Sequence, residues 1–276
     1  MLKDLFFPVT GASTDDATLA IAERIAEAYR ARLIISVPVA VPTALAAPWG
    51  FAPGPVLAEV LEEVEIHATK RAEDLRRRMA KSGVDWDVRV DRTRLFDPPE
   101  ALTLQARYAD LSVIAQPRGD DASIAHAFFN AFLFESGRPV MVVPPNFASR
   151  RFDKLLLAWK PTREATRAIH DALSLFAPSD VEVLVVDPEI GDLGHGDEPG
   201  ADIAAHLAER GLNVNVTRRA SGTMSVATTL RLHAAESGAD LLVAGGYGHT
   251  RLREWVLGGT TRDLLESLER PVLFSR

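Results

Sequence analysis

The chain has 276 residues, of which 47% are hydrophobic and 25% charged, and its formal net charge at pH 7 is −7. The length suffices for two domains of common size, and the negative charge argues against general affinity for nucleic acid or anionic membranes. The sequence contains no cysteine, which excludes disulfides, thiol catalysis and cysteine-based metal sites. It has no apolar run as long as a membrane span and no signal-peptide pattern at its start. We therefore expect a cytoplasmic protein.

The first half of the chain alternates short apolar runs with amphipathic stretches. Gly11 and Asp15 belong to the first turn, where Ser13 or Thr14 can cap the following helix. A long loop rich in proline and alanine covers residues 38–55. The apolar runs predict strands over residues 5–9, 33–37, 84–90, 111–115 and 139–144. Apolar residues three or four positions apart predict helices over residues 17–28, 57–79, 98–108 and 123–136.

The second half repeats this alternation. Strands are predicted over residues 155–158, 181–186, 214–216, 241–244 and 272–274, and helices over residues 163–176, 201–210, 223–237 and 260–269.

Two short sequence words support an internal duplication. Residues 109–115 match residues 239–245, and residues 136–142 match residues 268–274. Strands that alternate with helices imply parallel sheets with right-handed crossovers. We therefore predict an α/β protein with two tandem domains, residues 1–147 and 148–276, each a five-stranded, mostly parallel sheet flanked by helices.

The most informative stretch joins the strand at residues 241–244 to a predicted helix through a glycine-rich loop. Thr260 can cap that helix, with Asp263 three residues further on. Helix N-termini present unpaired N–H groups and a partial positive charge, and glycine lets the backbone approach a phosphate. The loop therefore predicts an anion site, although its spacing is neither that of a P-loop nor G-x-G-x-x-G. Its glycines are Gly245, Gly246, Gly248, Gly258 and Gly259.

The spacing of Gly245, Gly248 and Gly258 resembles the G-x2-G-x9-G-[S/T] phosphate loop of the universal stress protein family. The flanking words at residues 239–243 and 271–273 are also similar to that family. The resemblance covers the whole chain, as a tandem two-domain member. It implies flavodoxin-like or Rossmann-like domains that pair through a final edge strand, here as a pseudo-dimer within one molecule, with a homodimer of chains as a further option.

The resemblance also implies a nucleotide, ATP or AMP, with or without Mg²⁺, in the second domain. The phosphates are assigned to Gly245, Gly248, Gly258, Gly259 and Thr260. The family usually has Ser or Thr where this chain has Gly259, with Thr260 one residue later. This departure affects one hydroxyl contact to the phosphates.

A second departure lies at the end of the first strand of the second domain. Members of the family commonly have Asp there, near the adenine, whereas this chain has Lys160. Lysine has no acceptor, so any contact requiring the carboxylate is lost. Lys160 reaches a phosphate, pairs with Asp187 or stays exposed and solvated. Val185, at the end of the next strand, offers backbone groups to the base or ribose by resemblance.

The first copy lacks the glycine pattern. After Ala115 it reads Gln116-Pro117-Arg118-Gly119-Asp120-Asp121. Pro117 has no N–H to donate, and each Asp would repel a phosphate by about 1 kcal/mol at contact distance in water. We therefore expect no nucleotide in the first domain.

We identify no catalytic residue and no metal ligand. The sequence has no G-x-S-x-G turn and no evident acid–base pair, and the acidic loop around His195 is more typical of a solvated turn than of a metal site. The leading interpretation is a stress-response, nucleotide-binding regulatory or signalling module. One alternative is a family member that has lost nucleotide binding and acts on an unknown protein partner, its glycines only turning the chain. Another is a slow ATPase or ATP-using transferase.

Overall fold

The computed structural model describes residues 1–39, 54–92, 98–145, 147–148, 151–189, 191, 196–247 and 259–276. The predicted loop at residues 38–55 lies mostly outside these ranges. The strands are β1 (Asp4–Pro8), β2 (Arg32–Pro38), β3 (Trp86–Asp91), β4 (Leu111–Ala115), β5 (Val140–Val143), β6 (Lys154–Ala158), β7 (Asp180–Val186), β8 (Asn213–Arg219), β9 (Leu241–Gly245) and β10 (Val272–Ser275). The helices are α1 (Asp15–Tyr29), α2 (Gly54–Met79), α3 (Pro98–Ala106), α4 (Ala122–Ala131), α5 (Arg163–Phe176), α6 (Ala201–Ala208), α7 (Val226–Ser237) and α8 (Gly259–Glu266).

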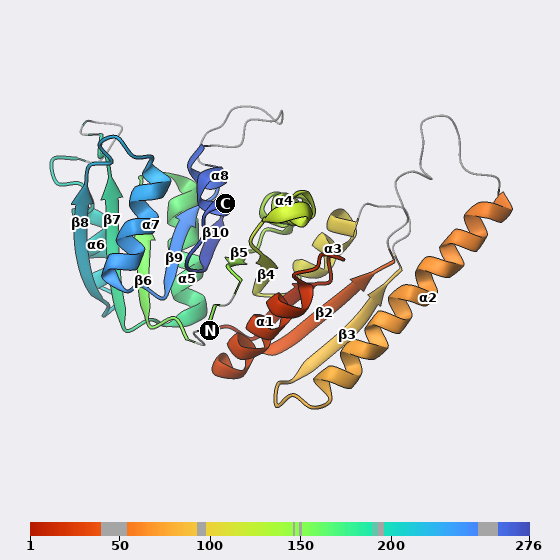
Figure 1. The fold of residues 1–276 in the computed structure, drawn as a ribbon. Coiled ribbons are helices and arrows are strands. Elements are labelled where there is room, and N and C mark those ends of the chain that lie inside the picture. Colours follow the sequence, from red (N-terminus) through yellow and green to blue (C-terminus); the bar gives the residue numbers. More distant parts are fainter. Residues whose placement is uncertain are drawn as a thin grey trace.

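The strands form one ten-stranded sheet in the order β3-β2-β1-β4-β5-β10-β9-β6-β7-β8. Figure 1 shows this order across the molecule, with the two halves of the chain side by side. Each half contributes five parallel strands, and the halves meet where β5 and β10 pair antiparallel, with Val140 opposite Phe274. The predicted fold class and the pairing of the halves through their last strands are therefore confirmed.

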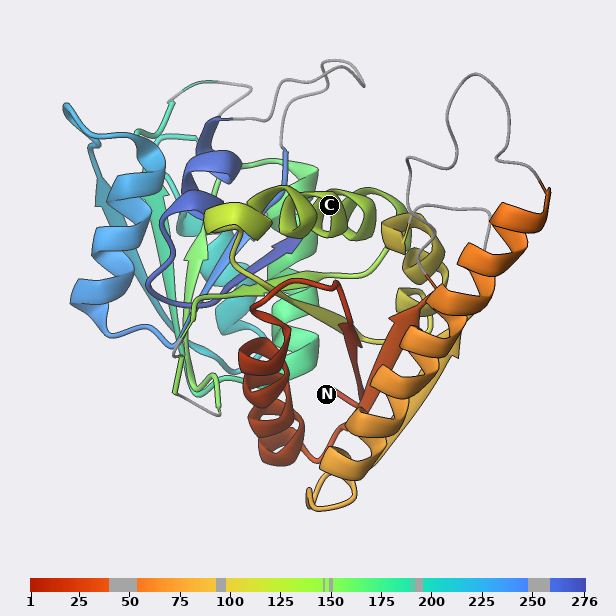
Figure 2. The same cartoon turned by 45° about the vertical axis from the view of Figure 1, so that its right-hand side comes forward.

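Two hydrophobic cores cover the two faces of the sheet, and each runs through both halves. One core joins the sheet to α1, α2, α5 and α6 through residues such as Leu19, Ala72 and Ile169. The other joins it to α3, α4, α7 and α8, and it includes Phe129 and Leu265. Helices therefore lie on both faces in both halves (Figures 1 and 2). This layering follows from strands that are apolar on both sides.

Aromatic residues pack together where the two halves of the chain are joined. The ring of Phe152, just before β6, stacks on Tyr29 of α1, and its centroid lies 4.9 Å from that of Phe176 in α5. The Tyr29 hydroxyl accepts a hydrogen bond from the Phe152 N–H at 2.8 Å. Buried aromatic pairs of this kind contribute about 0.5–1.5 kcal/mol beyond their burial. The two halves therefore share a packed interior as well as a sheet.

The repeated Ala-Asp-Leu word has the same structural task in both halves. The Asp110 carboxylate accepts from the N–H groups of Lys3 and Asp4 at 2.8 and 3.0 Å. Asp240 accepts from Asp153 and Lys154 at 3.1 and 2.9 Å. Each carboxylate thus ties the start of one strand to the start of its neighbour.

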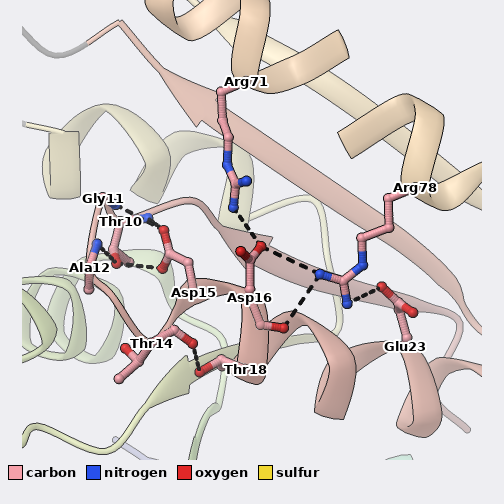
Figure 3. Close-up of polar contacts among 10 residues, drawn as sticks. All are labelled: Thr10, Gly11, Ala12, Thr14, Asp15, Asp16, Thr18, Glu23, Arg71 and Arg78. Carbon is pink, nitrogen blue, oxygen red and sulfur yellow. Dashed lines mark hydrogen bonds and ion pairs between the residues drawn. The ribbon is translucent and has the colours of Figure 1, made fainter. Parts of the chain in front are cut away.

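Helix α2 follows the outer strands of the first half (Figure 2). Arg78 of this helix bonds Glu23 of α1 at 2.8 Å. Arg71 and Arg78 also contact Asp16 of α1, as Figure 3 shows. These ion pairs connect the two helices that cover the same face.

Two local details differ from the sequence-based predictions. Neither Ser13 nor Thr14 caps α1, since the Thr14 backbone is helical and its side chain makes no capping hydrogen bond. The helix predicted at residues 123–136 consists of α4, which ends at Ala131, followed by a π-helical turn over Phe132–Ser136. Propensity does not distinguish such a turn from an α-helix.

Candidate functional site

The candidate site lies at the carboxyl ends of β6, β7 and β9 in the second half. Strand β6 pairs with β7 on one side and with β9 on the other. The chain leaves β6 toward α5 on one face, whereas α8, which follows β9, packs in the core of the other face. Open α/β sheets bind ligands at such a switch point, where the loops diverge.

Gly245 is the last residue of β9 and packs against the first turn of α5. A Cβ atom added to it would lie 2.6 Å from the Ala165 nitrogen and 2.7 Å from the Glu164 carbonyl carbon. Backbone atoms do not yield at such distances. The sheet and helix therefore require glycine at this position, whatever binds nearby.

Tyr247 ends the described part of the glycine-rich segment. Its backbone is left-handed, with φ of 52°, and its N–H donates to the Thr261 hydroxyl at 3.3 Å. Its own hydroxyl donates to the Asn130 side-chain oxygen at 3.0 Å, and its ring stacks on Phe134 at 4.9 Å between centroids. Burial raises the pKa of the Tyr247 phenol to about 12, so the phenol is a neutral hydrogen-bond donor at pH 7.

Gly259 and Thr260 begin α8 and are exposed. The prediction that Thr260 caps this helix is wrong, because Thr260 is its second residue. The buried hydroxyl is that of Thr261, which sequence reasoning missed; two adjacent threonines were a signal that one would face inward. A Cβ atom added to Gly259 would have no neighbour within 4 Å. Gly248 and Gly258 lie outside the described residues, as do the other positions from 249 to 257.

Lys160 and Val185 lie on the β6 and β7 side of the site. The Lys160 side chain is 57% exposed, and its ammonium is 3.9 Å from the Glu189 carboxylate. Its predicted alternative partner, Asp187, instead accepts from the N–H and hydroxyl of Ser221, and these hydrogen bonds lower the pKa of Asp187. The Val185 side chain is buried in the core, so this residue offers a ligand only its backbone.

An open hollow of about 850 Å³ lies beside this loop and along α5. Trp159 lines it, together with the charged or titratable side chains of Arg163, Glu164, Arg167, His170 and Arg276. Burial, with Arg210 and His206 nearby, lowers the pKa of His170, which keeps this imidazole neutral at pH 7. Two of the arginines have carboxylate partners, since Arg163 lies 3.4 Å from Glu164 and Arg167 lies 3.0 Å from Asp171. The hollow therefore carries charges of both signs.

The corresponding loops of the first half are closed by their own carboxylates. Asp15 accepts from the N–H groups of Thr10 and Gly11 at 3.0 and 2.9 Å and from the Thr10 hydroxyl at 2.7 Å (Figure 3). Asp121 accepts from the N–H and the hydroxyl of Ser13. The amide groups around this switch point therefore already have anionic partners.

The two copies differ at these positions. Counted from the matching strand starts, Thr10 corresponds to Lys160 and Asp15 to Ala165. The Ala165 N–H donates to the Thr162 hydroxyl, which caps α5. The second copy thus has a lysine and an alanine where the first has a threonine and a buried carboxylate.

A family model, that of the universal stress protein family, matches residues 151–276. In its second half, residues 151–276, the chain therefore belongs to the universal stress protein family. Its tandem arrangement agrees with a universal stress protein from Archaeoglobus fulgidus, which is 14% identical, with a TM-score of 0.69 over 99% of this chain and 96% of that one. A second structure, described as a universal stress protein from Pseudomonas aeruginosa, is 15% identical, with a TM-score of 0.53 over 99% and 93%.

These likenesses establish the fold of the whole chain and no ligand. A universal stress protein solved in complex with cAMP covers 52% of this chain and 97% of its own, at 20% identity and a TM-score of 0.31. That score is too low to place a ligand here. No curated protein matches the chain.

Within the described ranges of the chain, no group of three or more potential metal ligands comes together. His195 lies outside those ranges. No helix in the described part of the chain is long and apolar enough to cross a membrane.

Proposed function

We propose that this chain is a cytoplasmic regulatory or signalling module of the universal stress response that binds ATP or AMP, with or without Mg²⁺, in its second domain. The domain boundary that we propose lies between residues 147 and 148. The observation that carries the proposal is the contrast between the copies: carboxylates occupy the switch-point amides of the first domain, whereas the second has Lys160 and the exposed start of α8.

The chemistry of the second copy suits a phosphate chain. Gly259 and Thr260 present the start of α8, where unpaired N–H groups and the helix dipole favour an anion. Gly245, Gly248 and Gly258 complete the loop in the sequence pattern. Each charge-assisted hydrogen bond to such a group contributes about 1.5–3 kcal/mol.

The remaining contacts follow from the ends of β6 and β7. The Lys160 ammonium is exposed, and its carboxylate partner is 3.9 Å away, so it is free to exchange Glu189 for a phosphate. Such exposed ion pairs are worth about 0–1 kcal/mol and yield readily to a more highly charged ligand. The backbone of Val185 faces the base or ribose in this proposal.

Titration calorimetry of the full chain with ATP, ADP and AMP, each with and without Mg²⁺, tests the proposal. We expect one site per chain. Gly259→Glu should abolish binding without unfolding the protein, because the added side chain points into open space and its charge repels phosphate. Gly259→Ala is the matched control for the loss of glycine.

Three other outcomes would overturn parts of the proposal. Two sites per chain would show that the first domain also binds. No binding at millimolar nucleotide would favour a member that acts on a protein partner alone. Steady nucleotide turnover lost in Gly259→Glu would favour an ATPase or transferase.

A further inference from the structure

The two domains touch at the point where the glycine-rich segment begins. The Tyr247 ring stacks on Phe134 of the first domain, with 28° between the ring planes, and the Tyr247 hydroxyl donates to Asn130 of α4. Next to them, Gly246 lies so close to Leu133 that an added Cβ atom would be 2.7 Å from its Cδ2. The first domain is therefore in direct contact with two consecutive residues of this segment.

The contact supports a backbone conformation that tyrosine rarely adopts. A non-glycine residue at φ of 52° is disfavoured, because its Cβ atom crowds the following carbonyl. Such conformations persist where the surroundings hold them. Here the ring and the hydroxyl of Tyr247 are held by the first domain, and its N–H is held by Thr261 of α8.

Thr261 extends this support to the start of α8. Its hydroxyl accepts the Tyr247 N–H and is buried, with the residue 5% exposed. Gly259 and Thr260, which carry the proposed phosphate contacts, directly precede it. A hydrogen bond therefore joins Tyr247, just beyond β9, to the first turn of α8.

A second contact between the domains involves Gln116 and a later part of α8. Gln116, which follows β4 in the first domain, donates from its side-chain nitrogen to the Leu265 carbonyl at 3.1 Å. It also crosses between the domains, but it reaches α8 beyond its first turn. Gln116 therefore serves as a control for interdomain contact in general.

We propose that Asn130 and Phe134 of the first domain are positioning residues for the nucleotide site of the second. They hold Tyr247 in its left-handed conformation and, through Thr261, fix the start of α8. This inference rests on the proposed function and gives the first domain a role there that needs no nucleotide of its own.

The test compares full-length variants by nucleotide calorimetry, by thermal unfolding and by amide hydrogen exchange of the peptide that contains Tyr247. Asn130→Ala and Phe134→Ala should each weaken nucleotide binding by about tenfold, the equivalent of one hydrogen bond or ring contact. Both should speed exchange of the Tyr247 amide. Asn130→Asp keeps a side-chain acceptor and should retain most of the nucleotide affinity of the unaltered chain. Gln116→Ala should change that affinity less than twofold.

Each failure has a separate meaning. If the unaltered chain binds no nucleotide, the proposed function fails, and hydrogen exchange still decides whether Asn130 and Phe134 hold Tyr247. If the chain binds and the two alanine variants bind equally well, the positioning role is wrong while the proposed function stands. An equal loss in Gln116→Ala would point to general loosening of the junction and would also overturn it.

Discussion

The Asp121 carboxylate accepts both the backbone N–H and the hydroxyl of Ser13, at 2.8 and 2.5 Å. The two residues lie in the loops that follow β4 and β1, so they bridge the switch point of the first domain. These hydrogen bonds lower the pKa of Asp121, which keeps it ionised at pH 7. A phosphate entering here would have to displace a carboxylate that the protein itself provides.

Two substitutions of Asp15, which lies beside this bridge, should change the stability of the fold in different ways. Burial raises its pKa above the ordinary value of 3.8, and hydrogen bonds from Thr10 and Gly11 oppose this only in part. Asp15→Ala should destabilise the fold by about 1–3 kcal/mol, because it removes a carboxylate that accepts two part-buried N–H groups and the Thr10 hydroxyl. Asp15→Asn keeps an acceptor and removes the buried charge, so it should be neutral or stabilising at pH 7.

Urea unfolding at several pH values checks this. Since the folded-state pKa of Asp15 is raised, protonation favours the folded state, and the contribution of Asp15 is greatest below about pH 3.8. It declines as the pH rises through the folded-state pKa. Asp15→Asn should lose this dependence; an unchanged pH profile would contradict the assignment.

Two glycines of the second domain should respond in opposite ways to alanine. Gly245→Ala places a methyl group against the backbone of α5 and should cost about 1–3 kcal/mol, as overpacking does. Gly259→Ala meets no neighbour and should leave stability unchanged or raise it by up to about 1 kcal/mol, since alanine favours helix. Chemical denaturation measures both. A tolerated Gly245→Ala would show that this glycine serves a ligand and not the packing.

A buried cluster in the second domain should make stability depend on acid. The Glu182 carboxylate is 2.6 Å from His233 Nε2 and 2.7 Å from the Thr217 hydroxyl. Burial alone would raise the pKa of Glu182, but the hydrogen bonds from Thr217 and His233, with Lys154 nearby, together lower it. Its stabilising contribution is therefore complete above about pH 4.5 and is lost as the pH falls through the folded-state pKa.

Unfolding of the unaltered chain and Glu182→Gln between pH 3 and pH 7 tests the cluster. The glutamine variant should show a shallower loss of stability in acid. His233→Ala should cost about 3 kcal/mol at pH 7, because it removes one member of a buried hydrogen-bonded pair. Parallel acid profiles for the unaltered chain and Glu182→Gln would show that another carboxylate dominates.

Asp110 and Asp240 provide a matched pair, one in each domain. Each accepts two backbone N–H groups at the start of a strand, so each alanine substitution should cost about 1–3 kcal/mol. The two costs should add in the double variant, as they do for independent sites. Thermal or urea unfolding gives the comparison, with Asp→Asn at each position as a control that keeps an acceptor.

The sequence predicted the order of strands and helices because period and apolar runs are local properties. Arg163–Phe176 and Leu111–Ala115 begin and end where they were expected. Tertiary contacts decided what was missed. Thr261 rather than Thr260 faces inward because of the Tyr247 N–H, and Arg78 pairs with Glu23 because α1 lies beside α2. No residue spacing encodes either neighbour.

The candidate site was less predictable than the fold. A glycine pattern does not reveal which glycine the packing itself requires, and only the approach of Ala165 to Gly245 does so. Lys160 pairs with Glu189 and not with Asp187, because Ser221, from a later loop, donates to Asp187. Nothing in the glycine-rich segment itself indicated that Asn130 and Phe134, more than a hundred positions earlier, hold Tyr247.

The antiparallel pairing of β5 with β10 has a consequence for how the copies diverge. Two separate chains that paired through this edge would have to meet by diffusion, and both would carry identical sequences. Here the tether keeps the partner edge at a high effective concentration. Each domain therefore always pairs with the other domain of its own chain, whose sequence differs from its own. The loops of one domain can therefore change in sequence, as long as the other domain keeps the loops that bind the ligand.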